Sequence, residues 1–171
     1  MTEERQNAGE GGKSGQLKIF FGYAAGVGKT YAMLQAALMA EERGMDVVIG
    51  SIATYRSLED TALAERLRAM ERLEKFDLDQ AIRRKPDLII MDDLACENPK
   101  GSRHSRRYQD IRELLKAGIS VYTTVSAQNI ESLNDIVTAI TRVPVKDRIP
   151  DSVFDHADQV ELVDLEPREL L

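Results

Sequence analysis

The sequence contains only one cysteine, Cys96, which excludes an internal disulfide and a zinc site built from several cysteines. No apolar run approaches the roughly 20 residues of a membrane-spanning helix. The segment Met1–Gly15 has no hydrophobic core, so we expect no secretory signal there. There is also no basic excess: 23 Lys and Arg against 29 Asp and Glu give a net charge of −6, which argues against general nucleic-acid binding. With 43% hydrophobic and 30% charged residues, these absences predict one soluble, cytoplasmic domain.

The organisation of the chain is that of strands alternating with helices. Residues 1–15 are polar and rich in Gly and Glu, which predicts a disordered tail, and residues 16–171 are expected to form the domain. We expect strands at Leu17–Phe21, Asp46–Ile52, Asp87–Met91, Ile119–Val125 and Gln159–Val163. We expect helices at Lys29–Arg43, from Ser57 through Leu73, from Asp77 to before Pro86, at Arg106–Ala117, at Asn129–Thr141 and at Pro150–Ala157. This alternation predicts an α/β fold, a three-layer α/β/α sandwich around a mostly parallel sheet.

A glycine-rich segment, Gly22–Thr30, joins the first expected strand to the first expected helix. Glycine lets the backbone approach a phosphate closely, and main-chain N–H groups together with the helix dipole can bind the phosphate oxygens. Lys29 would reach the β- and γ-phosphates of a nucleotide, and the hydroxyl of Thr30 would hold Mg²⁺. The strict motif has its first glycine where this chain has Tyr23, so the alternative is a glycine-rich turn without a ligand. The candidate cofactor-binding residues of this loop are Gly26, Val27, Gly28, Lys29 and Thr30.

Two carboxylates, Asp92 and Asp93, stand at the end of the third expected strand. An apolar strand that delivers a carboxylate to the carboxyl edge of the sheet is typical of the Walker B arrangement, in which Asp92 would bind Mg²⁺ through water. Asp93 would then be the candidate catalytic residue that orients or deprotonates an attacking water. The alternative is that these aspartates only provide the turn chemistry with which a strand leaves a sheet.

A basic segment, Lys100–Arg107, follows that strand and places five potentially cationic side chains in a chain of net negative charge. Arg103 or Arg107 could contact a γ-phosphate or pair with the acidic end of the strand, and Arg103 is taken as a further cofactor-binding candidate. The alternative is a solvated loop followed by the N-terminus of a helix. The two histidines, His104 and His156, lack a second ligand at metal-binding spacing, so no histidine-based metal site is expected.

Several segments taken together resemble one known family. The run GSRH-x-x-RYQD, followed by ESLND, is more specific than the phosphate loop alone. The chain resembles the N-terminal cytoplasmic domain of the KdpD family of osmosensitive potassium-channel sensor histidine kinases. The segments that carry the resemblance are Leu17–Leu34, Phe76–Ile82, Pro86–Ala95, Gly101–Leu115, Gly118–Thr124, Glu131–Val137 and Pro150–Leu165.

The resemblance implies a P-loop fold that binds ATP and regulates the kinase and phosphatase balance of a distant catalytic core, within a two-component system controlling potassium transport. It carries phosphate and Mg²⁺ roles to Gly26, Gly28, Lys29 and Thr30, and a metal role to Asp92. The chain departs from the family pattern at Ala25, usually Pro, at Asp93, usually Glu, at Cys96, usually His, and at Ala53–Ser57, usually Glu-Thr-His-Gly-Arg. These departures weigh against hydrolysis more than against nucleotide binding.

The leading hypothesis is therefore a regulatory module that binds ATP or another nucleotide with Mg²⁺ and reports to a sensor-kinase core or its cognate response-regulator system, in cis or in trans. One alternative is an autonomous small P-loop ATPase or phosphotransferase, and another is a degenerate, ligand-free interaction module. Neither His104 nor His156 lies in a phospho-acceptor helix motif, so we expect no autophosphorylation and at most weak ATPase activity. The family domain usually continues beyond Leu171, which suggests a fragment of a larger protein or a short stand-alone relative.

Overall fold

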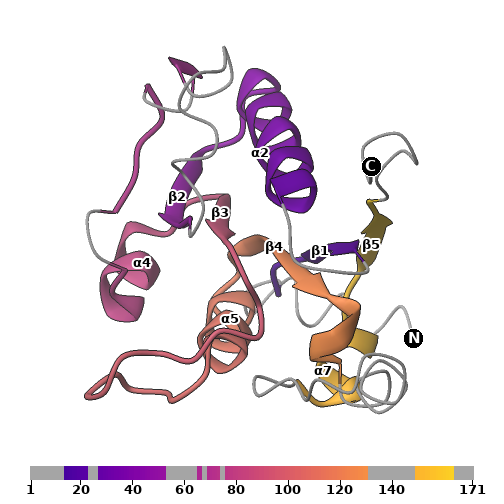
Figure 1. Ribbon diagram of the computed structural model, residues 1–171. Coiled ribbons are helices and arrows are strands. Elements are labelled where there is room, and N and C mark those ends of the chain that lie inside the picture. The colour runs from indigo at the N-terminus through magenta and orange to yellow at the C-terminus, as the bar shows by residue number, and fades with distance from the viewer. Residues whose placement is uncertain are drawn as a thin grey trace, which may run out of the picture.

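The α/β fold is confirmed by the computed structural model, which describes residues 14–22, 27–52, 65–66, 69–73, 76–130 and 149–163 (Figure 1). A short 3-10 turn, Ala127–Asn129, follows the fourth strand. In chain order the named elements are β1 (Leu17–Gly22), α2 (Val27–Glu42), β2 (Val47–Ser51), α4 (Leu78–Arg84), β3 (Leu88–Met91), α5 (Arg107–Lys116), β4 (Ser120–Ser126), α7 (Asp151–Asp155) and β5 (Gln159–Leu162).

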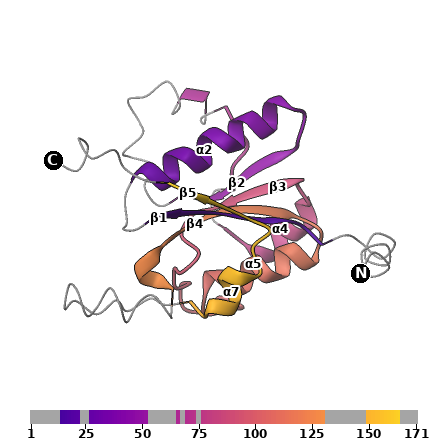
Figure 2. The same ribbon diagram turned by 90° about the vertical axis from the view of Figure 1, so that its right-hand side faces the viewer.

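The sheet has the strand order β2-β3-β4-β1-β5, and all four pairings are parallel. Helix α2 covers one face, whereas α4, α5 and α7 cover the other (Figure 2). The connection from β1 to β2 crosses the sheet in one direction, and each later connection moves in the opposite direction. Because crossovers between parallel strands are right-handed, these two directions place α2 and the later helices on opposite faces. The connections that follow the neighbouring strands β1 and β4 thus diverge, and α/β folds bind ligands at such a point.

Strand β3 lies inside the sheet, and all of its residues are buried. Its side chains alternate between two hydrophobic clusters, so that Ile90 packs with Phe20 and Leu34 on the α2 face. Ile89 packs with Ile19 and Ile111 on the α5 face. A strand covered on both faces needs the unbroken apolar run that the sequence shows at this position. The same alternation directs the residue after the strand, Asp92, towards the α2 side.

The helix ends follow local sequence signals. Asp77 caps α4, as expected, because its carboxylate accepts hydrogen bonds from the main-chain N–H groups of Asp79 at 2.9 Å and Gln80 at 3.2 Å. Gly44 and Gly118 follow α2 and α5 with φ of 96° and 90°. The left-handed backbone at these two positions costs glycine little, which explains why both helices stop there.

Two expected helices need correction. Residues 69–73 were expected to continue the helix that begins at Ser57, but they include an isolated parallel bridge between Arg72 and Ile49 of β2. The amide of Leu73 donates to the carbonyl of Ile49 at 2.9 Å, so this segment satisfies main-chain groups on the outer side of β2. Asn129 ends the 3-10 turn, and Ile130 is extended, so no α-helix begins at Asn129.

Several expectations fall outside the described residues. These are the helix start at Ser57, most of Asn129–Thr141, the segment after Val163 and the tail up to residue 13. Gly15, the last residue assigned to the tail, donates its N–H to the carbonyl of Leu115 at 2.8 Å. Across the ranges that the structure describes, no helix is long and apolar enough to cross a membrane.

Candidate functional site

The end of β3 meets the start of α2 at the carboxyl edge of the sheet. The hydroxyl oxygen of Thr30 lies 3.5 Å from both carboxylate oxygens of Asp92. Both side chains are buried, although they are far apart in the sequence. A separation of 3.5 Å is long for a hydrogen bond between a hydroxyl and a carboxylate, so the two groups face each other without a tight contact. The structure thus brings together the two residues predicted to hold Mg²⁺.

Lys29 lies beside them and is 7% exposed. Burial lowers the pKa of its ammonium group because the charged form loses hydration, while the nearby carboxylates of Asp92 and Asp93 act in the opposite direction. The ammonium group of a buried lysine can also form charge-assisted hydrogen bonds with an anionic ligand such as phosphate. The lysine of the predicted phosphate loop is therefore close to the predicted metal ligands.

Gly22 has a packing role at this site that the motif spacing did not reveal. It ends β1 and is buried. A Cβ atom at this position would lie 2.9 Å from Cδ and 3.0 Å from Cγ of Lys29. Real Cβ atoms almost never come this close to another heavy atom, so the stem of Lys29 occupies the space that a side chain would need. The absence of a side chain on Gly22 lets the lysine lie against the end of the strand.

The remaining residues of the predicted phosphate loop are placed only in part. Helix α2 begins at Val27, two residues before its expected start at Lys29, and Gly28 lies in its first turn. The first turn of a helix has main-chain N–H groups without an intrahelical partner, and these can bind an anion. Gly26 lies outside the described residues, so its predicted role in binding phosphate stays a prediction.

Asp93 lies in a tight turn that carries the chain away from β3. Its φ of 63° is left-handed, a conformation in which aspartate is enriched among non-glycine residues. One of its carboxylate oxygens accepts the N–H of Ala95 at 3.3 Å, and its carbonyl accepts the N–H of Cys96 at 3.2 Å. The structure therefore gives Asp93 the turn chemistry that the sequence analysis kept as the alternative to a catalytic role.

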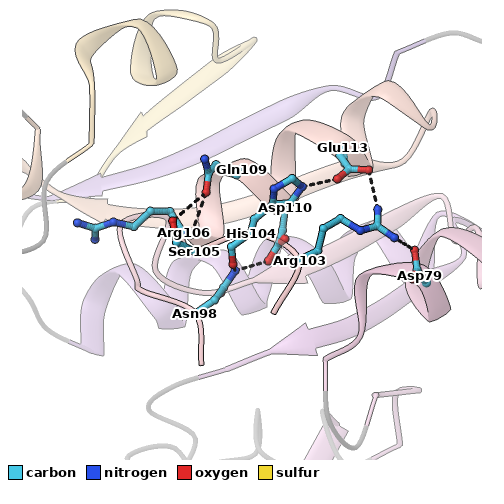
Figure 3. Close-up of polar contacts among 9 residues, drawn as sticks. All are labelled: Asp79, Asn98, Arg103, His104, Ser105, Arg106, Gln109, Asp110 and Glu113. Atoms are coloured by element: carbon cyan, nitrogen blue, oxygen red, sulfur yellow. Dashed lines mark hydrogen bonds and ion pairs between the residues drawn. The ribbon is translucent and has the colours of Figure 1, made fainter. Parts of the chain in front are cut away.

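The two arginines considered for the site lie in different surroundings. Arg103 forms ion pairs with Asp79 of α4 and with Glu113 of α5, the latter at 2.9 Å (Figure 3). Arg107 instead donates from Nη1 to the main-chain carbonyl of Asp92 at 2.9 Å. Arg107, and not Arg103, is the arginine that contacts the acidic strand end.

The segment between β3 and α5 is held by its own polar contacts (Figure 3). The side-chain amide of Asn98 donates to the carbonyl of His104 at 3.0 Å and to the carboxylate of Asp110 at 2.7 Å. Burial raises the pKa of Asp110, with the Asn98 hydrogen bond opposing it. His104 contacts Glu113, and this contact is the main reason that the pKa of Glu113 is lowered. Residues of the basic segment, His104 and Arg103 among them, thus form contacts that hold the loop against α5.

Thr124 is a further residue of the site, which no sequence motif indicated. Its hydroxyl donates to a carboxylate oxygen of Asp92 at 2.6 Å and accepts the N–H of Asp93 at 3.0 Å. Thr124 belongs to β4, which pairs with β3 in a register that aligns Thr123 with Met91. A polar residue near the end of the fourth strand was a usable signal, but the sequence did not establish that β4 lies next to β3.

The donor set fits a magnesium ion better than a metal held by protein alone. Mg²⁺ prefers oxygen ligands and is usually bound by one or two protein oxygens together with water and substrate phosphates. Thr30 and Asp92 provide such oxygens, and Lys29 provides a cation for phosphate. Among the described residues, no group of three or more His, Cys, Asp or Glu side chains could hold a metal ion. The site can therefore complete the coordination of a metal that arrives with a phosphate ligand.

Comparison with known proteins decides the family. Residues 13–171 match the family described as "KdpD: Osmosensitive K+ channel His kinase sensor domain". The chain belongs to the KdpD family. It is 53% identical over 166 residues to "Sensor protein KdpD" of Clostridium acetobutylicum, with 92% of this chain and 18% of that protein covered. It is 47% identical over 165 residues to "Sensor protein KdpD" of Escherichia coli, with 91% and 18% covered.

The chain thus spans less than a fifth of the length of these two relatives. A further relative, "Putative sensor protein KdpD" of Synechocystis sp., is 40% identical over 167 residues, with 92% of this chain and 45% of that protein covered. Among solved structures, the flagellar accessory protein FlaH from Methanocaldococcus jannaschii aligns with a TM-score of 0.45 and 14% identity, over 80% of this chain and 73% of that chain. A likeness at that level is too low to carry an argument.

Proposed function

We propose that this KdpD-family domain binds a nucleoside triphosphate, ATP in the first instance, together with Mg²⁺. The observation that carries the proposal is the meeting of Lys29, Thr30 and Asp92, all buried, at the carboxyl edge of the parallel sheet. The bound phosphates would be held by Lys29 and by the first-turn N–H groups of α2, including that of Gly28. Thr30 and Asp92 would hold Mg²⁺, which neutralises phosphate charge and orients the phosphate oxygens.

The same proposal assigns this domain a regulatory role. It would report nucleotide to a sensor histidine kinase core, on the cytoplasmic side of a larger protein, in a two-component system that controls potassium transport. The names of the relatives, which are sensor proteins, and the sensor-domain description of the family support this role. Binding without efficient hydrolysis is the favoured mode, because the carboxylate of Asp93 accepts a main-chain N–H in the turn after β3.

The nucleotide-binding proposal can be tested with Lys29→Ala. The variant should lose Mg²⁺-dependent ATP binding in isothermal titration calorimetry, because the phosphates lose their buried cation. Lys100→Ala is the matched control, since it removes the same charge from the exposed loop after β3 and should leave the affinity unchanged. Equal affinities for Lys29→Ala and the unmodified domain would contradict the proposal.

The regulatory role needs the full-length protein. Lys29→Ala introduced into the complete sensor kinase should change the ratio of kinase to phosphatase activity at a fixed ATP concentration, measured on its response regulator. An unchanged ratio, with ATP binding by the domain lost, would separate nucleotide binding from regulation and contradict the regulatory role.

A further inference from the structure

Asp92 is held by hydrogen bonds at its amide, its carbonyl and its carboxylate. Its N–H donates to the carbonyl of Ser51 at 2.9 Å, and its carbonyl accepts from Arg107 at 2.9 Å. Its carboxylate accepts the hydroxyl of Thr124 at 2.6 Å, a length typical of a hydroxyl bonded to a charged oxygen. The first two contacts hold the backbone of Asp92, and the contact with Thr124 restrains one oxygen of its carboxylate.

The direction of the hydrogen bonds at Thr124 follows from what each group can donate. The N–H of Asp93 can only donate, so it occupies a lone pair of the Thr124 oxygen. An ionised carboxylate can only accept, so the single hydroxyl hydrogen of Thr124 points to Asp92. The carbonyl of Thr124 also accepts the N–H of Leu94 at 2.8 Å. The residue is 4% exposed and β-branched, so its side chain has little freedom to leave this arrangement.

We infer that Thr124 is a positioning residue of the nucleotide site, which turns the carboxylate of Asp92 so that it can serve Mg²⁺ together with Thr30. The inference rests on the proposed nucleotide binding. Oδ1 of the carboxylate accepts the bond from Thr124 at 2.6 Å, and both carboxylate oxygens lie 3.5 Å from the hydroxyl oxygen of Thr30. Without the hydroxyl, Asp92 would lose this hydrogen bond while remaining buried, and its carboxylate could rotate. Loss of the Thr124 hydroxyl should therefore weaken the binding of Mg²⁺ and leave the proposed contact of Lys29 with phosphate unchanged.

The neighbouring residue Thr123 provides a matched control. It lies on the same strand and is fully buried, and among the residues that the structure describes its hydroxyl has no hydrogen-bond partner. Thr123→Val removes that hydroxyl at nearly constant shape, and removal of an unsatisfied buried polar atom should not lower stability. Thr124→Val makes the same chemical change one residue later, at the hydroxyl that contacts Asp92.

The experiment measures ATP affinity by calorimetry for both variants, with Mg²⁺ and with Mg²⁺ removed by EDTA. Thr124→Val should weaken Mg²⁺-ATP binding by about tenfold, the lower end of what loss of a supporting contact to a metal ligand costs. Affinity for ATP without Mg²⁺ should stay within about twofold, since Lys29 is untouched. Thr124→Ser keeps the hydroxyl and should restore the Mg²⁺ effect, and Thr123→Val should match the unmodified domain in both conditions.

A double-mutant cycle with Asp92→Asn protects the test against poor folding of Thr124→Val. Asparagine removes the buried charge, so the hydroxyl is no longer needed to stabilise it, and Thr124→Val should cause no further loss of Mg²⁺-ATP affinity in that background. An additional loss there, or an unchanged Mg²⁺ effect in Thr124→Val alone, would overturn the inference while leaving nucleotide binding intact. Absence of ATP binding by the unmodified domain in either condition would instead overturn the proposed function, and the inference with it.

Discussion

The side chain of Lys29 packs directly against Gly22 at the end of β1. This packing contact helps to place Lys29 in the candidate site. The strand reaches its end without a side chain, and the aliphatic stem of Lys29 fills the place where a Cβ would be. This arrangement keeps the lysine buried beside Asp92, where its charge is poorly hydrated. Gly22 stands one residue before the position of the motif's first glycine, and its packing role is to leave room for the stem of the motif's lysine.

Gly22→Ala should therefore weaken ATP binding by displacing Lys29, with a stability cost of about 1 kcal/mol from the crowding. The measurement pairs calorimetry with chemical denaturation. Gly44→Ala is the control: its φ of 96° strains any other residue, while nothing lies near its Cβ. That substitution should lower stability by about 1 kcal/mol and leave ATP affinity unchanged. If Gly22→Ala lowered only stability, the packing contact would have no role in binding.

The sequence predicts some residues of this site better than others. The proximity of Thr30 to Asp92 could be expected, because one follows the first strand, the other follows the third, and parallel strands end at one edge. Thr124 could not be assigned, because its role depends on β4 lying beside β3. The choice between Arg103 and Arg107 depended in the same way on partners from α4 and α5. The ligand roles themselves stay predictions.

At the scale of elements, Arg84 joins α4 to the segments around β2. Its guanidinium donates to both carboxylate oxygens of Asp46, at 2.7 and 2.8 Å, and to both of Glu71, at 2.9 and 2.7 Å. Asp46 immediately precedes β2, and Glu71 lies in the extended segment bridged to that strand. The hydrogen bonds from Arg84 are the largest cause of the lowered pKa of both carboxylates.

Arg84→Ala should lower the free energy of unfolding by about 1 kcal/mol at neutral pH, the scale of a well-formed but solvent-accessible ion pair. Because the carboxylate pKa values are lowered in the folded state, this stabilisation is present at neutral pH and is lost as the pH falls through them, below 3.8 for Asp46 and 4.5 for Glu71. Denaturation at pH 7 and pH 3 measures the difference. Arg83→Ala, at an exposed neighbouring position, should change little, and an effect of Arg84→Ala that did not decrease at all between pH 7 and pH 3 would point to packing instead.

The strands were easier to predict than the segments between them. Strands β1 to β4 coincide with short runs rich in apolar or β-branched residues, and the unbroken apolar run in β3 reflects its cover on both faces. Residues 69–73 were assigned to a helix because Met70 and Leu73 fit a helical period, but in the structure Met70 packs in one hydrophobic cluster and Leu73 packs against the other, as an extended segment allows. Strand β5 pairs with β1 at the edge of the sheet, although all its residues are exposed. Its place in the sheet therefore depends on main-chain pairing and not on burial of its side chains.

At the scale of the whole molecule, the strand order brings the buried charged residues Lys29 and Asp92 to the same edge of the sheet. Helices α2 and α7, which follow β1 and β4, lie on opposite faces of the sheet (Figure 2). The first turn of α2 follows β1, and the end of β3 lies next to β4, so both are close to the point where the two connections diverge. Lys29 is kept there although burial disfavours its charged form. A site that holds a buried cation ready for a ligand lowers the stability of the ligand-free protein, and binding of the ligand recovers it.

Lys29→Met should therefore raise the midpoint of thermal unfolding without ligand by a few degrees, since it removes the buried cation and keeps an unbranched side chain. The unmodified domain should gain about 2.7 kcal/mol from Mg²⁺-ATP at 100 times its dissociation constant, and the variant should gain nothing. The pKa of Lys29 is lowered in the folded state, so the unmodified domain should also become more stable as the pH rises towards 10.5, a trend that the variant lacks. Scanning calorimetry with and without ligand measures both effects. A lower midpoint for ligand-free Lys29→Met would mean that attraction to Asp92 and Asp93 outweighs the cost of burial.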